Sequence, residues 1–344
     1  MSNAEYAFMS AYLKGAEARM VTPDHIDRLS RTATVPDVME VIRDTEVGGY
    51  LETASVKTFD DSDRCLWQYF GRCLEQLEGL RLMPDDMCKV LNAYKVKYDI
   101  INIKAVLQSI PTGKQANLIP VGVIHMRGLL DELARAASVD AVIRLLVECG
   151  LGTYASVIRE YDTGNETGLK LQMEAGLDGE YYKNLLDTAK DVEDGFILAK
   201  TFGLSIDLIN LKIVSRAVIA EIGVVVSGCI ITGGYLLSSQ AVAGLLSGKL
   251  ADIPNALGGT PYRGIADEVV AGYNRTKSIT TVEEIIDRHR FHLLKETLSP
   301  RVMSPLVMAW YLTVKEVEIR NLRLIIKAAF DGISADEIRE YLVF

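Results

Sequence analysis

The sequence predicts an all-α protein that contains three tandem, pseudo-equivalent helical domains. Three observations lead to this prediction. One ten-residue phrase occurs three times, the copies follow one another at a nearly constant interval, and the apolar residues within each copy have helical spacing. The composition fits a globular protein with an ample core, because 49% of the 344 residues are hydrophobic and 24% are charged.

The repeated phrase reads YDIINIKAVL at residues 98–107, IDLINLKIVS at 206–215 and VEIRNLRLII at 317–326. Placed in register, the copies align an acid, an asparagine and a cation. The aligned residues are Asp99, Asp207 and Glu318, then Asn102, Asn210 and Asn321, then Lys104, Lys212 and Arg323. Glu318 and Arg323 depart from the pattern of the first two copies. The phrase recurs at about 110 residues, a length that can form a domain with its own core.

Further markers keep the same order and the same period. A tyrosine lies upstream of each phrase, at Tyr50, Tyr154 and Tyr262. The turn sequence LIPVGVI matches a later IITGGYL, and their glycines are Gly122 and Gly234. An aromatic pair precedes each phrase, as Tyr69-Phe70, as Tyr181-Tyr182 and, with one replacement, as Arg290-Phe291. These markers predict helical domains at residues 1–112, 113–224 and 225–344.

The helix formed by each phrase is expected to bury its acid. At about 100° per residue, Asp99 falls between Val106 and Ile103 inside the apolar stripe, and Asp207 and Glu318 take the same place. A buried charge without a partner is costly, so each acid needs one. The upstream tyrosines and the backbone N–H groups at a neighbouring helix start are both candidates.

Residue types kept in all three copies must serve something that all three copies share. We therefore predict that the repeated acids, asparagines and tyrosines stabilise the fold rather than bind a partner. Lys104, Lys212 and Arg323 flank the apolar stripe and could face a partner, but a solvated edge of the helix is the interpretation that we favour. Contacts with partners are expected among residues that differ between copies.

The charge and the cysteines exclude several classes of protein. The net charge of -9 and the lack of a basic block argue against binding to nucleic acid and favour a protein partner. The five cysteines are scattered without a Cys-x-x-Cys pair, which indicates reduced thiols rather than a disulfide frame or a zinc site. The first residues, MSNAEYAFMSAYLKG, lack the pattern of a secretory signal. We expect a cytoplasmic protein.

One segment is long and apolar enough to suggest a membrane span. No charged residue occurs between Glu221 and Lys249. Its glycines and the run Ser238-Ser239-Gln240 favour a helical hairpin over a span. The corresponding place after the first phrase holds the polar turn SIPTGKQANLIPVGVIHM, so a membrane span would have no counterpart there.

In order and period, these markers resemble the C subunit of archaeal and bacterial A/V-type rotary ATPases, which is similar to the d subunit of the eukaryotic V-type enzymes. The resemblance covers essentially the whole chain and depends on the three copies, the D-x-x-N-[IL]-K phrase, the aromatic pairs and the LIPVGVI turn. It implies three domains arranged as a funnel around a central opening, without catalytic activity, cofactor or direct nucleotide binding.

The same resemblance implies the partners. The shaft subunits of the soluble ATPase head would sit in the opening, and the membrane rotor ring would hold the protein peripherally on its cytoplasmic face. The protein would then transmit torque between ATP turnover and the transport of protons or sodium ions.

Other functions have weaker support in the sequence. A helical-repeat scaffold or adaptor without a motor role is the main alternative. The acids of FDDSD (59–63) suggest an all-helical isoprenoid synthase, but their spacing differs from the metal motif of those enzymes and an acidic helix start is the simpler interpretation. HRFH (289–292) places two histidines on one helix face without further metal ligands nearby. PTGKQ and SGKL lack the residues of a phosphate-binding loop.

Overall fold

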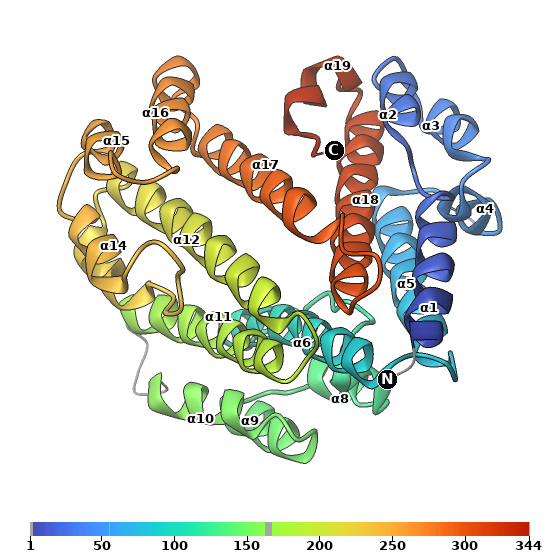
Figure 1. Cartoon of the computed structure of the whole chain (residues 1–344), viewed down its shortest axis with the longest axis horizontal. Coiled ribbons are helices and arrows are strands. Elements are labelled where there is room, and N and C mark those ends of the chain that lie inside the picture. The colour runs from blue at the N-terminus through green and yellow to red at the C-terminus, as the bar shows by residue number, and fades with distance from the viewer. Residues whose placement is uncertain (1–2, 55, 162–166, 344) are drawn as a thin grey trace. The chain divides into compact units, whose positions relative to one another are not determined.

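The computed structural model describes residues 3–54, 56–161 and 167–343 of the chain. Within these ranges the regular elements are α-helices and short 3-10 turns, and none is a strand (Figure 1). The all-α prediction is therefore confirmed. The chain forms two compact units, of which the first contains residues from both ends of the sequence and the second contains the middle.

The first unit comprises Met1–Asn92, Ile119–Val121 and Leu298–Phe344. Its helices are α1 (Asn3–Glu17), α2 (Pro23–Leu29), α3 (Val35–Ile42), α4 (Glu46–Glu52), α5 (Phe59–Glu78), the start of α6 (Asp85–Ser109), α18 (Leu306–Asp331), α19 (Ala335–Ile338) and the 3-10 turn η4 (Arg339–Tyr341). The long helix α18 packs against α1, α3 and α5. A helix from the end of the sequence thus forms its core together with helices from the beginning.

Threonine caps determine where the short helices of the first unit begin. The hydroxyl groups that cap α2, α3, α4 and α5 belong to Thr22, Thr34, Thr45 and Thr58, and each accepts an N–H from the residue three positions later. Asp61 completes a capping box with Thr58 at the start of α5. The acidic sequence FDDSD is therefore the first turn of a helix, where negative charge is stabilising.

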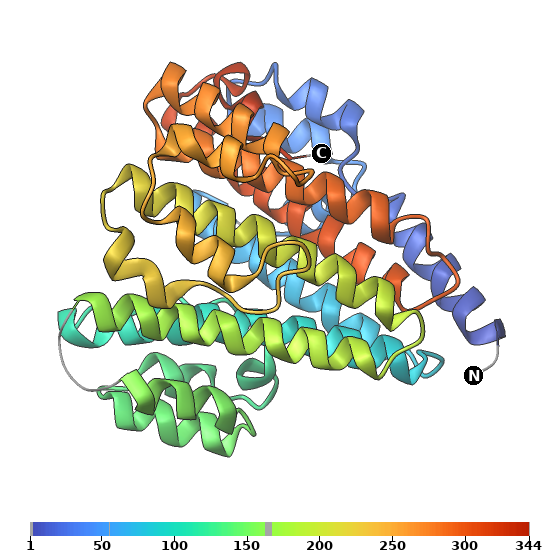
Figure 2. The ribbon, with the colours of Figure 1, turned by 60° about the vertical axis from the view of Figure 1, so that its left-hand side comes forward.

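The second unit comprises Ala93–Leu118 and Gly122–Thr297. After the end of α6 it contains η1 (Ile110–Thr112), α7 (Val123–Met126), α8 (Leu130–Ala134), α9 (Val139–Glu148), α10 (Gly152–Tyr161), α11 (Thr167–Lys190), α12 (Gly195–Ile219), α13 (Gly223–Val226), η2 (Ser227–Cys229), α14 (Ser239–Leu245), η3 (Leu250–Asp252), α15 (Ile253–Ala256), α16 (Arg263–Thr276) and α17 (Ile279–Leu298). The long helices α11 and α12 lie side by side, as Figure 2 shows.

Two large hydrophobic clusters form most of the core of the second unit, beside a small one of Ala217, Val226 and Cys229. One begins at Ala93 on α6 and continues to Leu185 on α11. The other begins at Leu204 on α12 and continues to Ile286 on α17. Each cluster joins a phrase helix with the segment that follows it, so the expected boundary after residue 112 lies within the first cluster. The three repeats are defined by the period of the sequence, whereas the two units are defined by packing. The organisation into three repeats therefore stays a prediction.

The uncharged stretch after Glu221 forms short elements rather than one long helix. It contains α13, η2 and α14, which are separated by turns. Among the residues that the structure describes, no helix combines the length and the apolar character needed to cross a bilayer.

A residue with a left-handed backbone follows each phrase helix, and after α6 this residue ends the 3-10 turn η1. Gly113, Glu221 and Gly332 follow their phrases at the same interval, and their φ angles of 65°, 56° and 68° are left-handed. After α12, the N–H of Ile222 donates a hydrogen bond to the carbonyl of Ala217. After α18, the N–H of Ile333 donates to the carbonyl of Ala328 in the same way. Glycine is the usual residue at such a helix end, because other residues strain the backbone there.

We expect Glu221→Gly to stabilise the second unit by about 1 kcal/mol, because glycine relieves the left-handed strain. Urea unfolding followed by circular dichroism measures the change. The matched substitution is Gly113→Ala in the same unit, where nothing lies within 4 Å of an added Cβ and only the backbone angle opposes it. It should destabilise by a similar amount. Equal unfolding midpoints for Glu221→Gly and the wild type would contradict the prediction.

Candidate functional site

Asp99 is buried on α6 and caps the helix that follows its phrase. Its exposed fraction is 0%. The carboxylate accepts the backbone N–H of Val123 at 2.8 Å and that of Ile124 at 3.0 Å, at the start of α7. Gly122, with a φ of 114°, comes so close that an added Cβ would lie 2.4 Å from Oδ1 of Asp99. The glycine of the LIPVGVI turn is therefore required by this carboxylate.

Asp207 repeats this arrangement on α12. It is also 0% exposed, and it accepts the N–H of Leu236 at 2.8 Å and that of Leu237 at 3.2 Å. The hydroxyl of Tyr262 donates to the same carboxylate at 2.9 Å. A Cβ at Gly234 would lie 2.2 Å from Oδ1 of Asp207. The two glycines of the repeated turn thus have the same function.

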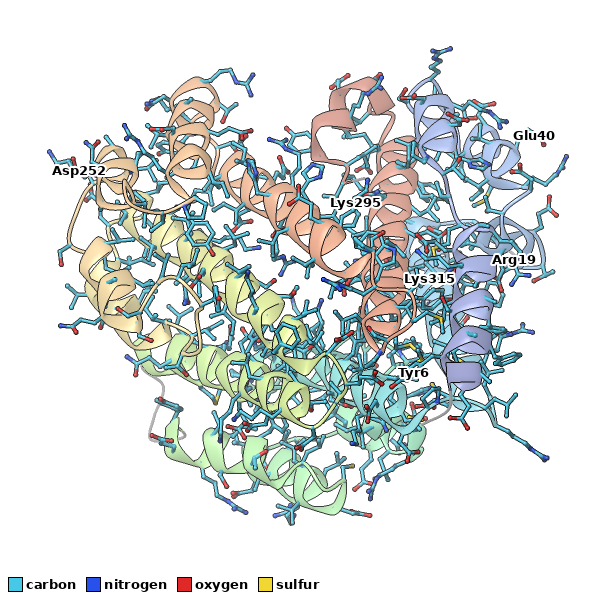
Figure 3. The ribbon with its side chains drawn as sticks, in the orientation of Figure 1. Tyr6, Arg19, Glu40, Asp252, Lys295 and Lys315 are labelled. Atoms are coloured by element: carbon cyan, nitrogen blue, oxygen red, sulfur yellow. The ribbon has the colours of Figure 1, made fainter. Side chains whose placement is uncertain are left out.

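Glu318 occupies the same position on α18 but reaches a different turn. Its Oε1 accepts the N–H of Val21 at 2.8 Å, and its Oε2 accepts a hydrogen bond from Lys315 at 2.8 Å. Lys315, labelled in Figure 3, is completely buried. It also donates to the hydroxyl of Tyr69 at 2.9 Å. The residues directly before Val21 include no glycine, unlike the turns that Asp99 and Asp207 bind. The extra methylene of glutamate extends the carboxylate toward this turn.

The tyrosines of the repeat have different contacts in the three copies. Tyr262 bonds to the acid of the preceding phrase, Asp207, and not to the phrase that it precedes in the sequence. Tyr154 is 2% exposed, and Asn184 donates to its hydroxyl at 3.5 Å. Tyr50 packs against Tyr69 with 5.5 Å between the ring centroids. The expected partners, tyrosine and backbone N–H, therefore both occur at Asp207.

The asparagines hold extended segments of the backbone. The side chain of Asn210 donates to the carbonyl of Ile231 at 2.8 Å and accepts its N–H at 2.9 Å. Asn321 makes the same pair of bonds with Val343, at 2.6 Å and 3.1 Å. Asn102 is 1% exposed. An asparagine is suited to this position because its amide carries both a donor and an acceptor.

The cations of the phrase form ion pairs within their own unit. Lys104 pairs with Asp178 at 2.5 Å, and Lys212 pairs with Asp287 at 3.0 Å. Arg323 pairs with Asp63 and also lies over the ring of Trp67, 5.0 Å from its centroid. The sequence could have indicated two of these acids. Asp178 lies three residues before Tyr181 and Asp287 three residues before Arg290, the first positions of the two aromatic pairs. Contact between these cations and a partner protein, the less favoured of the two interpretations, stays a hypothesis.

The motifs that suggested metal chemistry have other partners. Asp63 of FDDSD pairs with Arg323, and Asp61 accepts the N–H of Thr58 at 3.1 Å. His289 of HRFH contacts Glu268 at 2.6 Å. In the described ranges, no group of three or more His, Cys, Asp or Glu side chains is placed to hold a metal ion.

Burial shifts the pKa of the charged groups around the first phrase. Loss of hydration raises the pKa of Asp99 to about 6, although the two backbone N–H groups oppose this shift. Lys95 is 3% exposed, and burial lowers its pKa to about 8, while the nearby Asp99 acts in the opposite direction. Burial also raises the pKa of Asp207 and lowers that of Lys212. These groups therefore titrate closer to neutral pH than exposed ones.

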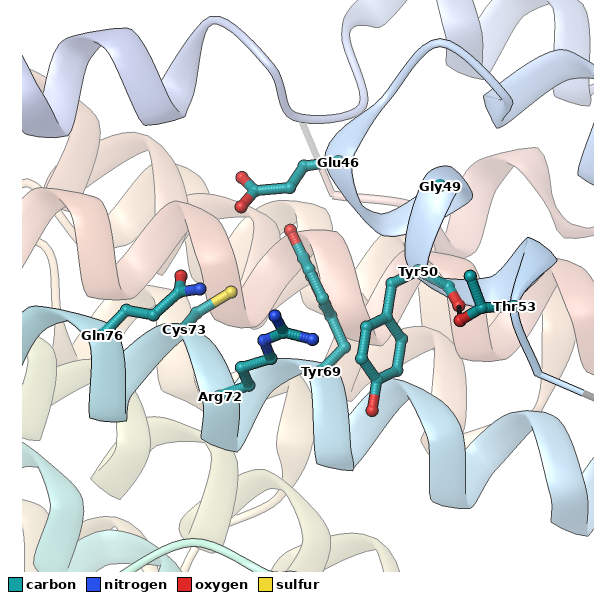
Figure 4. A pocket seen from close by; sticks show the side chains of 8 residues that line it. All are labelled: Glu46, Gly49, Tyr50, Thr53, Tyr69, Arg72, Cys73 and Gln76. Carbon is teal, nitrogen blue, oxygen red and sulfur yellow. Dashed lines mark hydrogen bonds between the residues drawn. The ribbon is translucent and has the colours of Figure 1, made fainter.

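A pocket of about 240 Å³ lies between α4 and α5 in the first unit (Figure 4). Its lining residues are Glu46, Gly49, Tyr50, Thr53, Tyr69, Arg72, Cys73 and Gln76. The guanidinium of Arg72 lies 5.9 Å from the centroid of the Tyr50 ring. Burial raises the pKa of Cys73 to about 11, so its thiol stays protonated and is a weak nucleophile.

A second pocket, of about 290 Å³, lies among α6, α11, α12 and α17 in the second unit, and we call it the interhelical pocket. Its lining residues are Lys97, Ile100, Ile101, Asp178, Tyr181, Tyr182, Ile209, Lys212, Ile213, Ile231 and Arg290. Both phrase helices of this unit and the aromatic pair Tyr181-Tyr182 therefore meet at one place. Its walls are mostly apolar, with charged groups among them.

We expect Asp207→Ala to destabilise the second unit by about 3 kcal/mol or more, because two backbone donors and the hydroxyl of Tyr262 lose their buried acceptor. Differential scanning calorimetry should show a melting temperature lowered by several degrees. The control is Asp187→Ala, whose side chain is 54% exposed and pairs with Lys190 at the surface. An unchanged melt for Asp207→Ala would show that this acid does not stabilise the fold.

Asp99 should make stability depend on pH. Its folded pKa of about 6 is above the ordinary value near 4, so the native state binds a proton that the unfolded state releases. The contribution of Asp99 is therefore fully present below pH 4 and is lost as the pH rises through 6. The advantage of the wild type over Asp99→Asn should shrink by roughly 3 kcal/mol between pH 4 and pH 8.

Urea unfolding at several pH values measures this difference. The control is Asp187→Asn. Because Lys190 lowers the pKa of that exposed carboxyl, the stability difference between wild type and Asp187→Asn should change with pH in the opposite direction. A difference between wild type and Asp99→Asn that stays constant with pH would exclude a raised pKa for Asp99.

Comparison with known proteins identifies the family. The family model described as ATP synthase (C/AC39) subunit matches residues 9–341. A relative from Methanocaldococcus jannaschii is 27% identical, and the alignment covers 99% of this chain and 86% of the relative. A relative from Thermococcus onnurineus is 25% identical, and the alignment covers 97% of this chain and 89% of the relative. A relative from Haloquadratum walsbyi is 22% identical, and the alignment covers 98% of both chains. All three relatives are named as the C subunit of an A-type ATP synthase. Since the family model spans nearly the whole sequence, this chain belongs to the ATP synthase (C/AC39) subunit family.

Proposed function

We propose that this protein is a non-catalytic central-stalk component of an A/V-type ATPase or ATP synthase. It acts as a socket that links the rotating shaft of the soluble head to the membrane rotor ring, and it transmits torque for proton or sodium transport. The observation that carries the proposal is the family match over residues 9–341, together with relatives that are named as C subunits of A-type ATP synthases and align along nearly their full length. The repeats then form a funnel of three domains around a central opening.

The contacts of the phrase helices support a mechanical role. A protein that transmits torque has to resist twisting, so its long helices need contacts that do not slide. Asp207 binds the backbone of a following turn, while Lys212, further along the same helix, pairs with Asp287 on α17. Hydrogen bonds with an ionised partner are stronger than neutral ones and depend on geometry. Each such helix is thereby fixed at more than one point along its length.

The proposed partners are the shaft subunits of the soluble head and the subunits of the membrane rotor ring. The protein would sit peripherally on the cytoplasmic face of the membrane, without binding nucleotide or nucleic acid. The net charge of -9 agrees with a protein partner rather than with nucleic acid.

Co-purification tests this proposal. An affinity tag on the chain, expressed in its source organism, should recover the shaft subunits and stoichiometric amounts of rotor ring from gently solubilised membranes. Membrane vesicles from cells that lack the chain should lose ATP-driven ion uptake, and expression of the chain should restore it. Recovery of other proteins in place of shaft and ring would favour the alternative, a helical-repeat scaffold without a motor role.

A further inference from the structure

The turn that Glu318 binds in the first unit is completed by a histidine. In the other two copies, one aspartate accepts the N–H groups of two consecutive residues. In the third copy, Oε1 of Glu318 accepts the N–H of Val21 at 2.8 Å, and Oε2 accepts a hydrogen bond from Lys315. The next N–H along the chain, that of Thr22, donates to Nδ1 of His25 at 3.1 Å. An imidazole nitrogen therefore takes the place of the second carboxylate oxygen.

His25 is also the third residue of α2, where it completes a capping box with Thr22. The hydroxyl of Thr22 accepts the backbone N–H of His25 at 3.3 Å, and Nδ1 of the ring lies 2.7 Å from the same hydroxyl. Glutamate or glutamine usually holds this position of a capping box, because the box needs a side-chain acceptor. A histidine is an acceptor only while one of its ring nitrogens carries no proton.

The partners of the His25 ring assign its protons. A backbone N–H is always a donor, so Nδ1, which accepts the N–H of Thr22, must be the unprotonated nitrogen. Nε2 then carries the proton and donates it to Oδ1 of Asp44 at 2.9 Å. This hydrogen bond lowers the pKa of Asp44, so that carboxylate stays ionised in mildly acidic solution. The side chain of His25 is 12% exposed, so protons can reach it from solvent.

A second proton on the ring would remove the acceptor at Nδ1. The hydroxyl of Thr22 can reverse its role and accept from the cationic ring, but the backbone N–H of Thr22 cannot. It would face another N–H across 3.1 Å. An aspartate in the same place behaves differently, because a protonated carboxyl group keeps acceptor capacity. Histidine is the side chain whose charge ordinarily changes near neutral pH.

The other contacts of the ring do not oppose this change. Nε2 carries its proton in both the neutral and the cationic ring, so the bond to Asp44 persists. Arg28, on the same helix, acts on Asp44 and lowers the pKa of that carboxyl further. The remaining charged side chains of α2, of α3, which packs against it, and of η4, which pairs with it, are Asp24, Asp27, Asp37, Glu40 and Arg339.

We propose that His25 makes the start of α2 a pH-sensitive switch. With a neutral ring, Glu318 and His25 together hold the N–H groups of Val21 and Thr22. With a cationic ring, the N–H of Thr22 is released and the first turn of α2 opens, while Glu318 still holds Val21. The switch needs no other subunit, so it can be tested on the isolated chain.

Amide hydrogen exchange of the full chain, measured by mass spectrometry, tests the switch. We compare the protection of residues 22–29 at about pH 8 and about pH 5, each corrected for the intrinsic exchange rate. The protection should fall about fivefold or more at the lower pH, because a helix start loses a cap. His25→Gln keeps a neutral acceptor in the same position, so its protection should change little.

The matched control is His289→Gln, which removes a histidine of the second unit that contacts Glu268. This variant should respond to pH at residues 22–29 as the wild type does. The melting temperature of each variant at both pH values shows whether it is folded. Equal loss of protection in the wild type and in His25→Gln, or no loss in either, would overturn the inference.

NMR of the wild type with isotopically labelled histidine gives a test that depends on no variant. In mildly alkaline solution, Nδ1 of His25 should carry no proton and Nε2 should carry one. On acidification, a proton should appear on Nδ1 over the same pH range in which the protection of residues 22–29 is lost. A proton on Nδ1 in alkaline solution, or a loss of protection that does not follow its appearance, would contradict the switch.

Discussion

The rest of the fold depends on a buried carboxylate that binds backbone N–H groups far away in the sequence. Asp99 and Asp207 each accept two such bonds, and Glu318 accepts one together with a bond from Lys315. An acid cannot stay ionised inside an apolar stripe without these donors. The contact therefore fixes the turn, requires glycine where the backbone comes within van der Waals distance, and holds the following helix in position.

The third copy satisfies the same constraint with different residues. Glutamate replaces aspartate where the turn has no glycine, and the buried Lys315 supplies a cation that also contacts Tyr69. Arginine replaces lysine at the ion pair, and its planar group can both bond to Asp63 and lie over Trp67. Glu318 and Arg323, the two residues that differ from the first two copies of the phrase, are thus local adaptations within the first unit. They need not be contacts with another protein.

Much of this arrangement could be predicted from the sequence. The all-α fold and the burial of Asp99, Asp207 and Glu318 follow from the helical period and from the position of the acids in the apolar stripe. Which tyrosine bonds to Asp207 could not be predicted, because the tyrosine upstream of its own phrase is Tyr154, whereas Tyr262, upstream of the next phrase, makes the bond. The link between Asp63 and Arg323 was also hidden, since packing brings together residues from opposite ends of the chain. Local patterns determine which face of a helix is buried, but not which distant segment covers it.

The order of synthesis has a consequence for the first unit. Its core joins helices before residue 92 with α18, so the early helices leave the ribosome about 200 residues before the helix against which they pack. Val343, which follows α18 in the sequence, is then bound by Asn321. The second unit is continuous in the sequence apart from Ile119–Val121, which belongs to the first unit. It can therefore complete its core while the chain is still being made. Premature termination would therefore leave a folded middle attached to an amino-terminal segment with exposed apolar helices, a species suited to recognition by chaperones and proteases rather than to assembly.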